Sequence, residues 1–344
     1  QLVAHYGVTM VLSTATQPSL PGLEPVREII PPAMDLYGRL KRVDIAFPKN
    51  RAVRQAWEEI AAELEQFEQV LCVVNTRKDC RELHALMPEG TIHLSATLCG
   101  EHRSHVIADI KAKLEAGRPV RVISTQLVEA GVDIDFPVVY RAFTGLPSIA
   151  QAAGRCNREG FSEEPGRVVV FMPPKPAPRG ELRKAEDTLI GLLATGLDAE
   201  SPTSYPQFFK AFYSAVPAVA QALEKAFEGW LTKNARDFQF QFREAAEAFR
   251  MIDDQASAAV IVRYGGNEPL IRSLLAVGPK RDIMRRLQRF TVTVPRRTLS
   301  GLLEKGFVEE PHPGVYVQTM PSLYSEVFGL DLYRDGLAPE DLIT

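Results

Sequence analysis

The sequence predicts an α/β protein in which a doubly wound parallel sheet is followed by a smaller, mainly helical α+β domain. As far as Met172, short segments that are apolar on both faces alternate with helical segments, a pattern typical of a parallel sheet covered by helices on both sides. Beyond Glu181 the segments become longer and helical, and strand-like runs follow them. A proline-rich stretch, residues 173–180, separates the two patterns. A length of 344 residues also favours two domains over one.

Five segments of the first half are predicted to be strands because they are short and rich in β-branched residues. They are VLCVV (70–74), TIHL (91–94), VRVIS (120–124), PVVYRA (137–142) and RVVVF (167–171). Between them, apolar residues at helical spacing predict helices. The predicted helices cover 51–67, 78–87, 103–116, which Gly117 ends, and 148–153.

Before this unit, residues 8–13 have the character of a strand, and a proline-rich connection follows from Ser19. The first residue is Gln1 rather than a methionine, so we expect a fragment of a longer protein. After the proline-rich stretch at 173–180, helices are predicted over 206–227 and 232–250. Strands are predicted over 257–264, 290–294 and 315–320.

Charge and cysteine content limit the functions to be considered. The net charge of −3 gives no general attraction to nucleic acid, so any such binding must be local. The strongest local cluster holds seven cations within 280–297, although a solvated helix face is the commoner explanation of such a run. The sequence has no apolar run near the roughly 20 residues of a membrane span, so we expect a cytoplasmic protein. The four cysteines form no C-x-x-C pair, and we expect reduced, mostly buried thiols.

Polar blocks follow several of the predicted strands, where open α/β sheets bind their ligands. Asn75 and Thr76 follow the strand 70–74 and could hold a phosphate at a helix start, although capping that helix is the commoner role. The second block, 124–135, begins at the end of the predicted strand 120–124. In it, Thr125 could contact a nucleic-acid phosphate and Asp133 a ribose hydroxyl, or both could be turn residues.

The third block, 151–158, carries Arg155 and Arg158 three positions apart. On a helix both would project from one face and could converge on a γ-phosphate. Gly154 favours this over a pair of surface arginines, because a small residue permits close approach of the helix to a neighbour. A fourth block, Thr14-Ala15-Thr16, follows the N-terminal strand.

In this order and spacing, the blocks resemble the motifs of superfamily two helicases. Thr14-Ala15-Thr16 resembles motif III, Asn75-Thr76 motif IV, residues 124–133 motif V and residues 151–158 motif VI. Several segments are similar to the type I CRISPR-associated helicase-nuclease (CRISPR-associated protein three). They are STQLVEAGVDIDF and QAAGRCNREG, VVNTRKD and HLSATLCGEHR upstream of them, and LQRFTVTVP at 287–295.

This resemblance implies a RecA-like fold and a division of the chain. Residues 1–18 would hold the last strand and motif III of a first RecA-like lobe, and 19–40 the linker between lobes. The second helicase lobe would span 41–180 and a C-terminal domain 181–344. Single-stranded DNA would be contacted by Asn75, Thr76, Arg103, Thr125, Thr14 and Thr16. ATP would be held by Gln151, Asp133 and Gly131, with Arg155 and Arg158 as arginine fingers.

The resemblance also implies partners and cofactors outside this sequence. They are the crRNA-guided Cascade surveillance complex and an N-terminal half with the first lobe and an HD nuclease. That half would hold Mg²⁺ with ATP and the metal ions of the nuclease. This sequence has no G-x-x-x-x-G-K-[ST] phosphate loop, no acidic box, and six histidines that do not form an HD cluster. We therefore expect no metal site here, and a chain that alone neither hydrolyses ATP nor cuts DNA.

Two alternatives stay open. The chain could be the second lobe of another superfamily two helicase, acting on DNA or RNA in repair or RNA metabolism. It could also be a shortened product that binds DNA or Cascade without catalysis.

Overall fold

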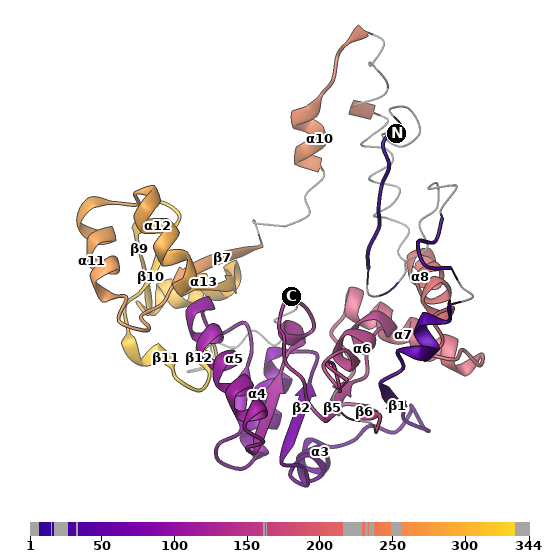
Figure 1. Ribbon diagram of the computed structural model, residues 1–344. Helices are drawn as coiled ribbons and strands as arrows, with labels where there is room; N and C mark the ends of the chain where they lie inside the picture. Colours follow the sequence, from indigo (N-terminus) through magenta and orange to yellow (C-terminus); the bar gives the residue numbers. More distant parts are fainter. Residues whose placement is uncertain are drawn as a thin grey trace.

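The structure is a computed structural model that describes residues 7–14, 16, 27–31, 34–160, 162, 164–215, 229–230, 233, 237–248 and 256–333. It contains a six-stranded and a four-stranded sheet, each with its own helices, and a two-stranded pair (Figure 1). The α/β fold predicted from the sequence is confirmed.

The larger sheet is parallel throughout and has the strand order β1-β6-β5-β2-β4-β3. Its strands are β1 (Val43–Ala46), β2 (Gln69–Val73), β3 (Ile92–Leu94), β4 (Val120–Ser124), β5 (Val138–Ala142) and β6 (Gly166–Phe171). The helices that connect them are α3 (Trp57–Leu64), α4 (Arg77–Leu86), α5 (Gly100–Glu115) and α6 (Leu146–Ala153), with the short turn η2 (Gln126–Val128). All five predicted strands are confirmed.

Alternating side chains of the central strand β2 enter opposite layers of the core. Leu71 and Val73 pack in the layer that also holds Ile110 of α5, whereas Val70 and Cys72 pack with α3 and α4. Both layers exclude water, and each fully buried large apolar side chain stabilises the fold by about 1.5–3 kcal/mol. The sheet is therefore covered on both faces, as its continuous apolar strands predicted.

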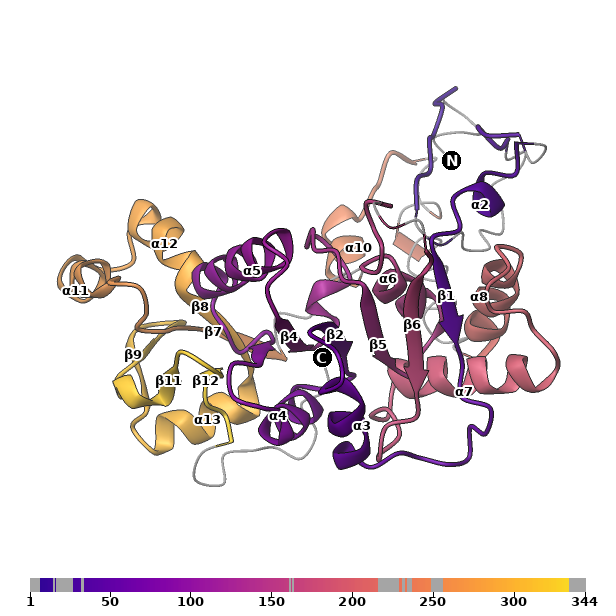
Figure 2. The same ribbon diagram turned by 60° about the horizontal axis from the view of Figure 1, so that its bottom comes forward.

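Two further helices pack on this sheet beyond the proline-rich stretch. They are α7 (Glu181–Ala194) and α8 (Ser204–Ala215), and Figure 2 shows them on the β1 and β6 side. Leu189 of α7 and Phe208 of α8 share a core with Val170 of β6. Packing on this sheet therefore continues beyond residue 180, where the sequence was divided into lobe and C-terminal domain.

The smaller sheet is mixed and has the order β8-β7-β10-β9. Its strands are β7 (Ser257–Ile261), β8 (Thr291–Pro295), β9 (Val308–His312) and β10 (Val315–Gln318). The helices α11 (Glu268–Val277) and α12 (Arg281–Leu287) pack on one face, and α13 (Arg296–Glu304) packs on the other. Short elements complete the described chain: α2 (Leu36–Arg39), α10 (Phe242–Ala248), η5 (Gln288–Phe290), η6 (Pro321–Leu323), β11 (Tyr324–Ser325) and β12 (Gly329–Leu330).

The C-terminal segment docks on the loop that leads into α5. The Leu330 N–H donates to the Thr97 carbonyl at 2.9 Å, and the Thr97 hydroxyl donates to the Phe328 carbonyl at 2.7 Å. Gly329 lies between these bonds with a positive φ of +67°, and a Cβ there would lie 2.2 Å from the Thr97 oxygen. Only glycine fits this position. The two sheets are thus joined through the start of α5, as both views show.

Some local expectations were wrong. Residues 7–14 form no strand, and Val8, Val11 and Leu12 are exposed. The helix expected from residue 51 begins only at Trp57, while Val53 is 59% exposed. Strand β1 was not predicted. Ala15, residues 19–26 and 32–33 of the proposed linker, and 216–227 of the helix predicted over 206–227 lie outside the described residues. The helix predicted over 232–250 is interrupted, because residues 239–241 are not helical and α10 begins only at Phe242.

Candidate nucleic-acid and nucleotide site

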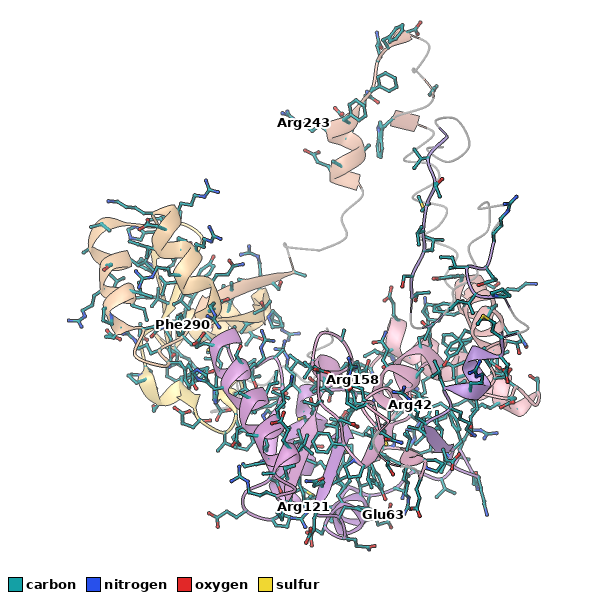
Figure 3. All side chains as sticks on the ribbon, in the orientation of Figure 1. Arg42, Glu63, Arg121, Arg158, Arg243 and Phe290 are labelled. Carbon is teal, nitrogen blue, oxygen red and sulfur yellow. The ribbon has the colours of Figure 1, made fainter. Side chains whose placement is uncertain are left out.

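Three of the residues predicted to contact DNA lie near the carboxyl ends of the parallel strands. Asn75 follows β2, Thr125 follows β4, and Arg103 lies on α5, which follows β3. Arg158 does not share this edge, and Figure 3 shows it near Arg42, which directly precedes β1. The adjacent Asn157 donates to the carbonyls of Phe136 and Arg42, at the amino ends of β5 and β1. The carboxyl-edge position predicted for the blocks after β2 and β4 is therefore found, whereas that predicted for 151–158 was wrong, because α6 returns the chain to the amino ends of the strands.

Asn75 is buried and its amide is fully engaged within the protein. Its Nδ2 donates to the Phe143 carbonyl at 2.9 Å, and its Oδ1 accepts from Arg141 Nη1 at 2.7 Å. The Asn75 backbone carbonyl accepts from Gln126 Nε2 at 2.8 Å. The Asn75 side chain therefore links the ends of β2 and β5. A phosphate at this position would contact the backbone of the block rather than the amide.

Thr76 is the N-cap of α4. Its hydroxyl accepts from the Asp79 N–H at 3.0 Å, which is the commoner role weighed from the sequence. The next residue, Arg77, is buried, and its Nη1 lies 3.5 Å from the Thr293 carbonyl of β8. Burial lowers the pKa of Arg77, and the nearby Arg103 lowers it further. Two arginines, Arg77 and Arg103, therefore lie close together where the start of α4 faces the C-terminal domain.

Thr125 and Arg103 flank this position. Thr125 is buried and donates its N–H to the Leu94 carbonyl at 3.2 Å. Arg103 is half-buried, and its guanidinium lies beside Gly100, where the backbone of Arg289 also approaches. Arg103 thus sits at the junction of α5 and the C-terminal domain, with its charge available to an anion.

Thr14 and Thr16 bond to each other rather than to the sheet edge. The Thr14 hydroxyl donates to the Thr16 carbonyl at 2.8 Å and accepts from the Thr16 N–H at 3.2 Å. The structure gives the expected fourth block a local turn, and Ala15 between them lies outside the described residues.

Arg155 binds the loop that resembles motif V. Its Nε donates to the Val128 carbonyl at 2.7 Å and its Nη2 to the Glu129 carbonyl at 2.6 Å. The residue is 7% exposed, and burial, with the neighbouring Arg158, lowers its pKa. The guanidinium is therefore committed to two backbone carbonyls and fixes the loop 126–129.

Arg158 is the accessible guanidinium of the pair. Its side chain is 39% exposed, and its Nε lies 2.8 Å from Asp133 Oδ1, whose side chain is 64% exposed. Lys111 approaches the same carboxylate at 3.5 Å. Asp135 accepts from the Arg158 N–H at 2.7 Å and so holds the backbone of this loop. An exposed pair of this kind can exchange its carboxylate for a ligand anion at little cost.

The helical argument for the two arginines was wrong. Helix α6 ends at Ala153, and Asn157 has a positive φ of 44°, so Arg155 and Arg158 do not share a helix face. Gly154 caps the helix and is exposed, and a Cβ there would meet the helix's own carbonyls rather than a neighbouring element. Gln151 is half-buried in the last turn of α6, and Gly131 has a φ of +71° in an exposed turn before Asp133.

Arg141 is the residue that sequence reasoning missed. It lies within β5, is completely buried and forms an ion pair with Glu129 at 3.0 Å. A lone arginine inside an apolar run gives no periodic signal, and only the folded structure reveals its partners. Burial lowers its pKa, and Glu129 opposes that effect.

The described residues set limits on other chemistry. Within them, no group of three or more His, Cys, Asp or Glu side chains could hold a metal ion. Nor does any helix in the described ranges combine the length and apolarity that crossing a membrane requires. All four cysteines are buried, as predicted, and none is paired with another.

Comparisons with known proteins agree with this arrangement. Residues 66–160 match the family model described as CRISPR-associated nuclease/helicase Cas3, C-terminal. A curated CRISPR-associated nuclease/helicase Cas3 from Haloferax volcanii is 40% identical over 90 residues, which are 25% of this chain and 10% of that protein. The range that matches the family model includes Asn75, Thr125, Asp133 and Arg158.

Solved structures match over more of the chain and show the fold. The crystal structure of T. fusca Cas3 has a TM-score of 0.52 at 17% identity and covers 80% of this chain and 39% of that one. T. fusca Cas3 with ADP gives 0.51 at 17%, covering 84% and 41%. The chain therefore spans less than half of these relatives. Its predicted resemblance to the C-terminal half of a superfamily two helicase of the Cas3 kind is confirmed.

Proposed function

We propose that this chain is the second motor lobe and C-terminal domain of an ATP-dependent single-stranded DNA translocase that degrades foreign DNA in CRISPR antiviral defence. The observation that carries the proposal is the arrangement of three helicase-like blocks on one lobe, with 75–76 and 124–125 at the carboxyl edge of the sheet and Arg158 exposed beside Asp133 near the amino ends of β5 and β1. The family match over 66–160 spans these three blocks.

On the nucleic-acid side, the proposal assigns phosphate contacts to the start of α4, to Thr125 and to Arg103. Arg103 supplies the positive charge, and the first backbone N–H groups of α4 supply hydrogen bonds. Because Thr76 already caps the helix and the Asn75 amide is engaged, their backbones rather than their side chains carry the contact.

On the nucleotide side, the exposed residues fit one face of a triphosphate site. Arg158 would leave Asp133 and stabilise the negative charge that develops on the transferred phosphoryl group. Asp133 would then be free to accept a ribose hydroxyl. Gln151 and Gly131 would lie beside the nucleotide, and Arg155 would hold the loop in place. A first lobe, with its phosphate loop and acidic residue, would supply ATP and Mg²⁺ binding. T. fusca Cas3 has been crystallised with ATP and with ADP.

The test compares this chain with a longer protein that also carries the first lobe. The chain alone should show no DNA-dependent ATP hydrolysis, and the two-lobed protein should show it. Arg158→Ala should lower that rate about a thousandfold or more. Turnover by the isolated 344-residue chain would contradict the proposal.

The partner and the polymer are also proposals. A Cas3-like protein would be recruited by the crRNA-guided Cascade complex and would carry an HD nuclease in its N-terminal half. Stimulation of ATP hydrolysis by single-stranded RNA but not DNA would favour the alternative of an RNA helicase, since that choice depends on whether the site needs the 2′-hydroxyl. Binding without hydrolysis in the two-lobed protein would favour a non-catalytic module.

A further inference from the structure

Arg141 joins elements that belong to different helicase-like blocks. Its Nη1 donates to Asn75 Oδ1 at 2.7 Å, and its Nη2 donates to Ser148 Oγ of α6 at 2.9 Å. The same Nη2 lies 3.0 Å from Glu129 Oε1. One buried guanidinium thus contacts the block after β2, the block after β4 and the helix that leads to the arginines.

Glu129 extends this connection to the arginine block. Its carboxylate accepts from the Ser148 hydroxyl at 2.7 Å, and its backbone carbonyl accepts from Arg155 Nη2 at 2.6 Å. Any displacement of Glu129 therefore moves two partners at once. One is Arg141 on the nucleic-acid side, and the other is Arg155 on the nucleotide side.

This network is a poor means of gaining stability. A buried ion pair costs desolvation that its mutual attraction does no more than offset, and apolar residues of similar size often serve as well. Arg141 Nε is also buried without a hydrogen-bond partner, which adds a further cost. The network does fix the relative orientation of the groups that it joins, because a planar guanidinium holds several acceptors at set angles.

We propose that the Arg141–Glu129 pair is a positioning unit that couples occupancy of the DNA block to placement of the Arg155–Arg158 loop. The inference rests on the proposed function. DNA bound at the start of α4 would shift Asn75, and Arg141 would transmit the shift through Glu129 and Ser148 to the loop that Arg155 holds. Neither Arg141 nor Glu129 touches DNA or nucleotide in this scheme.

The experiment uses the two-lobed protein and measures four quantities: ATP hydrolysis with and without single-stranded DNA, DNA affinity, and the change in DNA affinity on adding a non-hydrolysable ATP analogue. Ser148→Ala removes one hydroxyl from the network. The double variant Arg141→Met with Glu129→Leu removes both charges together, so neither is left buried alone. Ser273→Ala is the matched control, since that hydroxyl bonds within α11 at an exposed position.

Both network variants should keep DNA-free hydrolysis and the affinity for DNA alone, while stimulation by DNA falls about fivefold or more. The analogue's effect on DNA affinity should fall by the same factor, because coupling between two binding sites is reciprocal. The control should change nothing. A purely structural role would instead lower stability and all four quantities together, and that result would overturn the inference, as would unchanged stimulation in both variants. An unmodified protein with no DNA stimulation would refute the proposed function itself.

Discussion

Arg155 and Arg158 should respond differently to replacement by alanine, although they stand three residues apart. Arg155 is buried and donates to two backbone carbonyls. Hydrogen bonds from charged groups contribute about 1.5–3 kcal/mol each, so Arg155→Ala should lower the free energy of unfolding by about 3 kcal/mol. Arg158 lies in an exposed ion pair with Asp133, and Arg158→Ala should cost less than about 1 kcal/mol.

Urea unfolding followed by tryptophan fluorescence would measure the first effect, because Trp57 is buried in the lobe. ATP hydrolysis by the two-lobed protein would measure the second, with a loss of about a thousandfold or more for Arg158→Ala. Arg158→Lys tests whether the planar guanidinium or only its charge is needed. Arg272→Ala, at an exposed position of α11, is the control. If Arg155→Ala abolished hydrolysis at unchanged stability, Arg155 would face the nucleotide and the geometry argued here would be refuted.

Three further outcomes are expected. Thr76→Ala should destabilise the chain by about 1 kcal/mol because it removes the cap of α4, whereas Thr76→Ser keeps a capping hydroxyl and should not. The urea midpoint measures both variants, and equal midpoints would contradict the capping role. Burial, with His84 and Arg81 nearby, lowers the pKa of His93 to about 3. Since the unfolded chain then binds this proton more readily, the free energy of unfolding should be highest above pH 6.5 and fall by about 1.4 kcal/mol per pH unit below it. His93→Gln should flatten that dependence in pH-resolved unfolding, and an unchanged slope would count against it. Arg103→Ala should weaken binding of all single-stranded DNA sequences and lower the salt slope by about 0.7, whereas a sequence-selective loss would exclude a phosphate contact.

The sheet could be predicted from the sequence because its strands are buried on both faces. Continuous apolar runs such as 70–74 and 120–124 have no other simple explanation in an α/β pattern. Strand β1 was not predicted because it is only four residues long and lies at the edge of the sheet, where Val43 and Ile45 alternate with exposed residues. The start of α3 was misplaced because Val53 fits the helical spacing but is exposed, and tertiary contacts rather than spacing decide where a helix begins.

The places of Asn75 and Thr125 in the fold could be predicted, but that of Arg158 and the orientation of the side chains could not. Strand direction puts Asn75 and Thr125 at the carboxyl edge, whereas α6 carries the chain back to the amino ends of the strands before Arg158. Whether an amide or guanidinium points outward depends on partners far along the chain, such as Phe143 for Asn75 and Val128 for Arg155. Arg141 stayed hidden for the same reason, since its partners come from three separate segments.

The docking of Gly329 and Leu330 on Thr97 has a consequence for exchanging parts between related proteins. Thr97 lies two residues before the cap of α5, and the Cys99 N–H at that cap donates to the Tyr324 hydroxyl at 3.0 Å. The last strands of the chain therefore define where α5 starts and how Arg103 is aimed. A hybrid that took its C-terminal domain from another source would have to bring residues 95–103 with it, or the helix would begin in the wrong place.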